Sequence, residues 1–212
     1  MAMTLPRLTD DALRAGILDM CAIAIEMLQL TRNAFKQSST AAMEQLAGLG
    51  HDLHLKDKRL TAHVAMQLRE APWVLGSAEH LAFVPAALER IGDQVESLAR
   101  CVQAIHRDSI QFSERATTEV MALFNRGADL LTQLADVIRT HDRTPLARIH
   151  EAGQAFQALC DEAMLDHQER VIRGTCTPRA SSVYLAMLDF SREIERYVRR
   201  MAAAVEKALP AP

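Results

Sequence analysis

The stretch ALERIGDQV, residues 87–95, shows the pattern that decides the fold. Its apolar residues Leu88, Ile91 and Val95 recur at spacings of three and four. This spacing puts them on one face of an α-helix, and we expect that face to be buried. The same spacing recurs along most of the chain, so the sequence predicts an all-α protein.

The composition agrees with this prediction and excludes several classes of protein. Of 212 residues, 49% are hydrophobic but only 4% are aromatic, with 8 glycines and 7 prolines. Such a composition disfavours an all-β fold, and a net charge of −3 is not the basic footprint of a nucleic-acid binder. No apolar run approaches the roughly 18 residues that span a bilayer. No signal peptide is visible, so we expect a cytoplasmic protein with reduced cysteines.

The apolar periodicity predicts six long helices separated by short joints. Thr9 or Asp10 can cap the first helix, and Pro72 ends the second. Thr144-Pro145 and Thr177-Pro178 each offer a cap followed by proline at the first helical position. The predicted helices cover approximately residues 10–35, 40–71, 76–106, 114–138, 144–172 and 178–209.

The six predicted helices fall into two similar groups of three. Short joints make consecutive helices antiparallel. We therefore expect two tandem three-helix bundles, residues 1–110 and residues 111–212, each with an up-down-up arrangement.

Glu89 and Asp93 carry the clearest chemistry. They lie four residues apart beside the buried stripe, so both carboxylates emerge on one half-sheltered face. Like charges at this spacing repel, and we expect an arginine, a bound cation or water to compensate them. Oxygen ligands favour hard ions such as Mg²⁺, Mn²⁺, Ca²⁺ or ferric iron, and a solvated face is the alternative.

The segment Leu88-Glu89-Arg90-Ile91-Gly92-Asp93 resembles the motif of the phosphate-uptake regulator (PhoU) family. Gln94 and Ser97 stand where that family usually has His and Asn. The resemblance extends over nearly the whole chain in the number, length and order of the helices. It implies two tandem three-helix repeats with a multinuclear site for iron or zinc on the outer face of the bundle.

Further ligands for such a site would come from the second helix. Asp52 and Asp57 are the family-style candidates, although five residues correspond to about 500° of helix, which is imperfect geometry for one ion. His51 and His54 lie close by and offer imidazole nitrogens, and exposed polar residues are the alternative for all four. A carboxylate pair in the fifth helix raises the same question with lower odds: Glu162 and Asp166.

The second half departs from the motif. Asp189 and Glu193 lie 100 residues after Glu89 and Asp93 and form one candidate pair. A second register pairs Glu195 with Glu89 and then puts Arg199 at the other acidic position. A third register, like that of sodium/phosphate cotransporters, puts arginines at both acidic positions. We therefore expect weak or absent metal binding here, and a basic strip formed by Arg192, Arg196, Arg199 and Arg200.

Three other segments look like the PhoU-like domains appended to sodium/phosphate cotransporters. They are Phe112-Ser113-Glu114-Arg115-Ala116, His167-Gln168-Glu169-Arg170 up to Gly174, and Ala180-Ser181-Ser182-Val183-Tyr184-Leu185. The chain would then be a free-standing relative of that appended domain. We expect its other histidines at the surface or at helix ends: His106, His141, His150 and His167.

No catalytic motif is visible, including the paired E-x-x-H motifs of di-metal enzymes in helical bundles, so we expect no enzyme. The resemblance implies a regulator that couples a phosphate transporter to a partner such as a sensor kinase. The alternative is a protein that stores or buffers iron or zinc. The ten methionines suit adaptable apolar contacts with other proteins. A contact between two copies of the chain, which would make a homodimer, is one such contact.

Overall fold

The structure is a computed structural model that describes residues 11–70 and 75–209, without the side chains of residues 67, 68, 70 and 75–82. Within these residues the chain forms six helices and no strand. They are α1 (Asp11–Lys36), α2 (Thr40–Glu70), α3 (Leu75–Arg107), α4 (Glu114–Thr140), α5 (Thr144–Ile172) and α6 (Pro178–Ala208). The predicted all-α fold is confirmed. No helix in this part of the chain is long and apolar enough to cross a bilayer.

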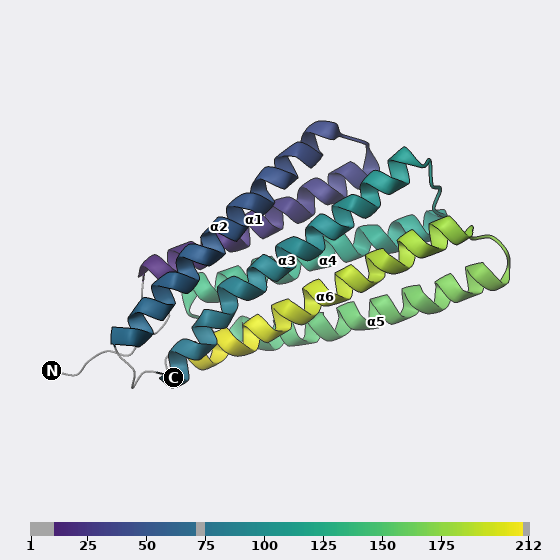
Figure 1. The fold of residues 1–212 in the computed structure, drawn as a ribbon. Helices are drawn as coiled ribbons and strands as arrows, with labels where there is room; N and C mark the ends of the chain where they lie inside the picture. The colour runs from purple at the N-terminus through teal and green to yellow at the C-terminus, as the bar shows by residue number, and fades with distance from the viewer. Residues whose placement is uncertain (1–10, 71–74, 210–212) are drawn as a thin grey trace.

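The helices run up and down along one common direction (Figure 1). Four of them, α1, α3, α4 and α6, form the centre, with the most extensive packing between α3 and α6. α2 covers α1 and α3, whereas α5 covers α4 and α6. The described parts of α2 and α5 do not contact each other, so each presents a broad face away from the core.

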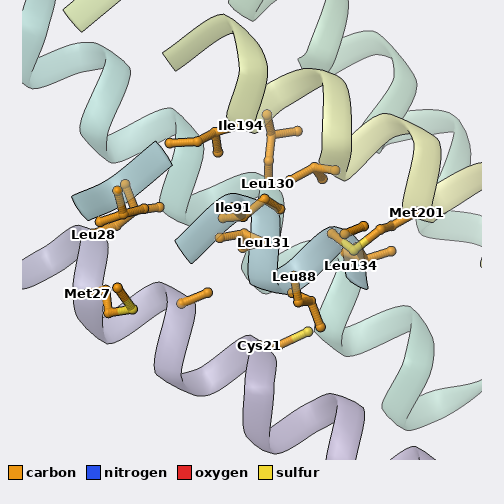
Figure 2. Close-up of a cluster of buried hydrophobic side chains, with 14 of the residues drawn as sticks. Cys21, Met27, Leu28, Leu88, Ile91, Leu130, Leu131, Leu134, Ile194 and Met201 are labelled. Atoms are coloured by element: carbon orange, nitrogen blue, oxygen red, sulfur yellow. The ribbon is translucent and has the colours of Figure 1, made fainter. Parts of the chain in front are cut away.

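One apolar core joins the two halves of the chain. Figure 2 shows side chains from the four central helices meeting there. Burial of each large apolar side chain contributes about 1.5–3 kcal/mol, which explains why the periodic positions decide the fold. Fully buried members include Met27 from α1, Ile91 from α3, Leu131 from α4 and Met201 from α6.

Side-chain caps begin α4 and α6, and the cap of α6 is the one that the sequence predicts. The Ser113 hydroxyl accepts a hydrogen bond from the Ala116 amide at the start of α4. The Thr177 hydroxyl accepts one from the Ala180 amide at the start of α6. Each bond satisfies one of the amides that a helix N-terminus leaves unpaired.

The expected cap of α5 is wrong. Thr144 lies inside the helix, and Arg143 precedes it with no side-chain cap bond. The Asp142 carboxylate instead accepts a hydrogen bond from the Thr144 amide at 2.8 Å. The expected caps Thr9 and Asp10 and the expected stop at Pro72 lie outside the described residues.

Candidate functional site

A cleft of about 430 Å³ lies between α2 and α3 and holds the acidic motif. Gly92 helps to form it, because a Cβ atom there would lie 2.4 Å from Leu53 Cδ2. The glycine thus lets α2 approach α3 closely beside the carboxylates. The side chains lining the cleft with groups able to bind a cation are His51, His54, Glu89, Asp93 and Glu96.

Glu89 and Asp93 are partly sheltered and are compensated by the chain itself. The Glu89 side chain is 21% exposed and the Asp93 side chain 46%. Arg90 Nη1 lies 3.2 Å from Asp93 Oδ2, and Arg90 Nε lies 3.9 Å from Glu89 Oε2. The Nδ1 atom of His54 lies 3.2 Å from Glu89 Oε1. Of the three compensating groups considered from the sequence, an arginine is therefore present.

The structure does not bring Asp52 and Asp57 into this cleft. Asp57 Oδ1 instead accepts a hydrogen bond from the Thr61 hydroxyl at 3.3 Å, along its own helix. Leu53 is buried against the core, so its neighbour Asp52 points outward to an exposed position. Within the described residues, no three histidine, cysteine or acidic side chains are arranged to hold a metal ion.

Most arginines of the expected basic strip on α6 are paired with carboxylates. Arg192 Nη2 lies 2.7 Å from Asp161 Oδ1, and Arg196 pairs with Glu193. Arg200 instead lies over the Phe83 ring, 4.6 Å from its centroid. The positive charge of the strip is therefore largely neutralised. Its arginines Arg192 and Arg196 also pair with Asp189 and Glu193, the candidate D-x-x-x-E pair.

Glu195 lies between α5 and α6, at the position that corresponds to Gly92 when residues 103 apart are paired. It is only 1% exposed, accepts a hydrogen bond from the Gln157 amide, and has Arg199 Nε 3.1 Å from its carboxylate. Gly153 makes room for it, because a Cβ atom there would lie 2.6 Å from Glu195 Oε1. A buried carboxylate compensated in this way fills the space beside Gly153, and a cleft of about 600 Å³ between the two helices begins further along at Arg199.

A second polar cluster, missed as a unit by sequence reasoning, lies where α4, α5 and α6 meet. Glu119 is 8% exposed and is its centre. The Glu119 carboxylate accepts a hydrogen bond from the Tyr184 hydroxyl. Arg170 Nη2 donates to it at 3.1 Å and Arg115 Nε at 3.2 Å. Arg115 also pairs with Asp166, one of the weaker metal candidates.

His167 belongs to this cluster and is buried, so its expected place at the surface is wrong. Its ring stacks on Tyr184 at a centroid distance of 5.1 Å, and its Nε2 lies 2.8 Å from the Ser181 hydroxyl. Burial, followed by the nearby Arg170 charge, lowers the pKa of His167. Burial, followed by the hydrogen bond to Glu119, raises the pKa of Tyr184.

The signal for this cluster was present in the sequence. The three segments that look like the cotransporter-appended domain begin at residues 112, 167 and 180, far apart in the chain. In the structure all three contribute to the cluster, through Arg115, His167, Arg170 and Tyr184. Periodicity alone does not say which side chains of these three segments meet.

Comparisons with known proteins agree with the fold. Residues 17–102 match the family model of the PhoU domain. The fold is similar to that of PhoU from Pseudomonas aeruginosa, with a TM-score of 0.84 and 14% identity over 93% of this chain and 95% of that chain. For the phosphate transport system regulatory protein PhoU from Streptococcus pneumoniae the TM-score is 0.79, with 13% identity over 93% of each chain. For a PhoU-like protein from Shewanella oneidensis it is 0.63, with 10% identity over 93% of this chain and 98% of that chain. The curated protein sequences contain no match.

Six antiparallel helices with the acidic cleft on the third define a PhoU-like helical bundle. The match to the PhoU domain model covers residues 17–102, which include that cleft. The low identities to the solved structures establish the shared fold, and the activity of those proteins is a separate question.

Proposed function

We propose that this chain is a non-enzymatic, cytoplasmic regulator of phosphate transport, which couples a phosphate transporter to a regulatory partner such as a sensor kinase. The supporting observation is the PhoU domain match over the helices that carry the acidic cleft. Long helices offer wide faces for docking, and a few buried apolar anchors would supply most of the binding energy. The partly exposed Glu89 and Asp93 would set the specificity of that contact.

Recovery of partners from membranes tests this proposal. The tagged chain is incubated with detergent-solubilised membranes, and the bound proteins are identified by mass spectrometry. Recovery of a phosphate transporter or sensor-kinase component supports the proposal, and recovery of neither overturns it. Glu89→Gln with Asp93→Asn should lower the yield. The control is Asp129→Asn, because Asp129 is exposed on α4, away from the cleft.

A second candidate function is the storage or buffering of iron or zinc. The observation in its favour is the set of five side chains with nitrogen or oxygen donors that line one cleft. Arg90 and His54 already contact the two carboxylates, and no three donors converge in the described residues. Binding would therefore require these side chains to rearrange.

Elemental analysis of the purified chain distinguishes the two functions. Stoichiometric iron or zinc that is lost in Glu89→Ala, with unchanged helix content by circular dichroism, supports metal handling. Metal-free protein that still recovers its partner contradicts metal handling and leaves the regulator proposal standing. Glu206→Ala is the matched control, because Glu206 is exposed on α6 and lies outside the cleft.

We also propose that residues 1–110 and 111–212 are two tandem copies of one three-helix unit. Buried residues 103 positions apart support this division, as in Ile17 with Val120, Leu53 with Phe156 and Val95 with Val198. With this offset, the residues that correspond to Glu89 and Asp93 in the second copy are Arg192 and Arg196. Superposition of the two halves in a crystal structure should give the same offset, and any other offset would contradict the proposal.

A further inference from the structure

The large apolar side chains that remain exposed gather on the two outer helices. Leu165 is 65% exposed, Ile172 85% and Met66 55%. Within the described residues, all side chains of this kind lie on α2 or α5: Leu55, Met66, Leu165, Val171 and Ile172. Because α2 and α5 each pack on only two other helices and not on one another, the described part of the chain leaves these side chains largely uncovered.

On α2 the exposed apolar residues form a face with a basic border. Leu55, Ala62 and Met66 follow at spacings of seven and four, which place them on one side of the helix. Residues 55–69 contain four basic residues and one acidic residue, a net charge of +3 with histidine neutral. We call this the basic face of α2, and its border is formed by Lys58, Arg59 and Arg69.

On α5 the corresponding face has an acidic border. Ala158, Leu165 and Ile172 follow at spacings of seven, again on one side of the helix. Residues 151–172 contain five acidic residues and one arginine, a net charge of −4 with histidine neutral. We call this the acidic face of α5, and its border is formed by Asp161, Glu162 and Glu169.

The border carboxylates stay accessible although each approaches an arginine of its own chain. Glu169 pairs with Arg173 at 2.5 Å yet remains 57% exposed. Glu162 lies 3.9 Å from Arg115 and is 71% exposed. Within the described part of the chain, Lys58 and Arg59 on the other face form no ion pair. The two faces therefore carry opposite charges that are available to a second molecule.

We propose that the basic face of α2 in one copy of this chain packs on the acidic face of α5 in a second copy. The apolar residues of the two faces would supply most of the binding energy, and the borders would set the register and speed of association. Each face has an apolar centre of similar length and a border of the opposite sign, which is the complementarity that a second copy provides. The proposal does not depend on the transport role.

A charge-exchange experiment tests this contact. Sedimentation velocity over a range of concentrations measures self-association of the chain, of Arg59→Glu and of Glu162→Arg. Each single variant faces a like charge across the contact and should show an apparent Kd raised about tenfold. An equimolar mixture of the two variants brings Glu at position 59 of one copy against Arg at position 162 of the other. The mixture should therefore regain association.

Three further measurements complete the test. Lys207→Glu makes the same charge change outside both faces and should associate like the unaltered chain. Leu165→Asp should abolish association while keeping its helix content, because Leu165 is largely exposed in the single copy. High salt should weaken association. A chain that stays monomeric at every concentration overturns the proposal. Association that survives both single charge reversals, or a mixture that regains nothing, also overturns it.

Discussion

Replacing Glu119 with leucine removes the centre of the buried cluster and leaves Arg170 without its countercharge. The Glu119 side chain is 9% exposed and the Arg170 side chain 14%, so water compensates neither group well. Removing one partner of a buried ion pair costs about 3–5 kcal/mol of unfolding free energy. For a chain of this length, 1 kcal/mol lowers Tm by about 2–4 °C, so Glu119→Leu should lower Tm by at least about 6 °C.

Thermal and urea unfolding followed by circular dichroism measure this loss. Tyr184→Phe removes only the hydroxyl donor and should cost about 1 kcal/mol, because Arg170 and Arg115 still contact Glu119. Combining Glu119→Leu with Arg170→Leu removes both charges, so the double variant should be more stable than the sum of the two single losses predicts. Strictly additive losses in the double variant would refute the reasoning. A loss of unfolding free energy below about 1 kcal/mol in Glu119→Leu would also refute it.

Three more predictions concern buried positions. His167 has a lowered pKa in the folded chain, so the unfolded chain binds its proton first and the unfolding free energy should fall as pH drops below 6.5; His167→Gln should flatten that part of a urea-unfolding series against pH. Gly153→Ala places a Cβ atom 2.6 Å from Glu195 Oε1 and should lower the unfolding free energy by about 1–3 kcal/mol, measured in urea. Phe156→Ala removes a ring that is 1% exposed and should cost about 3–5 kcal/mol in the same assay, and an unchanged midpoint would contradict its place in the core.

The sequence predicts the helices well because the local signals agree with the packing. The apolar stripe through Leu88, Ile91 and Val95 is buried, and the predicted cap Thr177 begins its helix. The wrong cap is at the start of α5, where the side chain that accepts the hydrogen bond lies two residues before the predicted one. Asp142 accepts a hydrogen bond from the Thr144 amide, and this choice depends on how the α4–α5 joint turns.

The site is harder to predict because it depends on contacts between helices. Spacing alone puts Glu89 and Asp93 on one face, and the structure places both at the cleft. The same spacing does not reveal that His54 lies nearer to Glu89 than Asp52 does, since this depends on the rotation of α2 against α3. The sequence predicts His167 at the surface or at a helix end, whereas a tyrosine ring and a serine hydroxyl hold it in the interior.

A single residue difference separates the α2–α3 contact from the equivalent place in the α5–α6 contact. In the pairing of residues 103 apart, Gly92 corresponds to Glu195. Glycine leaves the α2–α3 surface open beside two partly exposed carboxylates. Glu195 fills the equivalent space and is compensated by Gln157 and Arg199. The cleft between α5 and α6 lies further along these helices, beside Arg199 and Glu206. A partner that recognises the Glu89–Asp93 pair would therefore find it on α3 and not at the equivalent place on α6, where this pairing puts Arg192 and Arg196, so the two halves of the bundle are distinguishable to it.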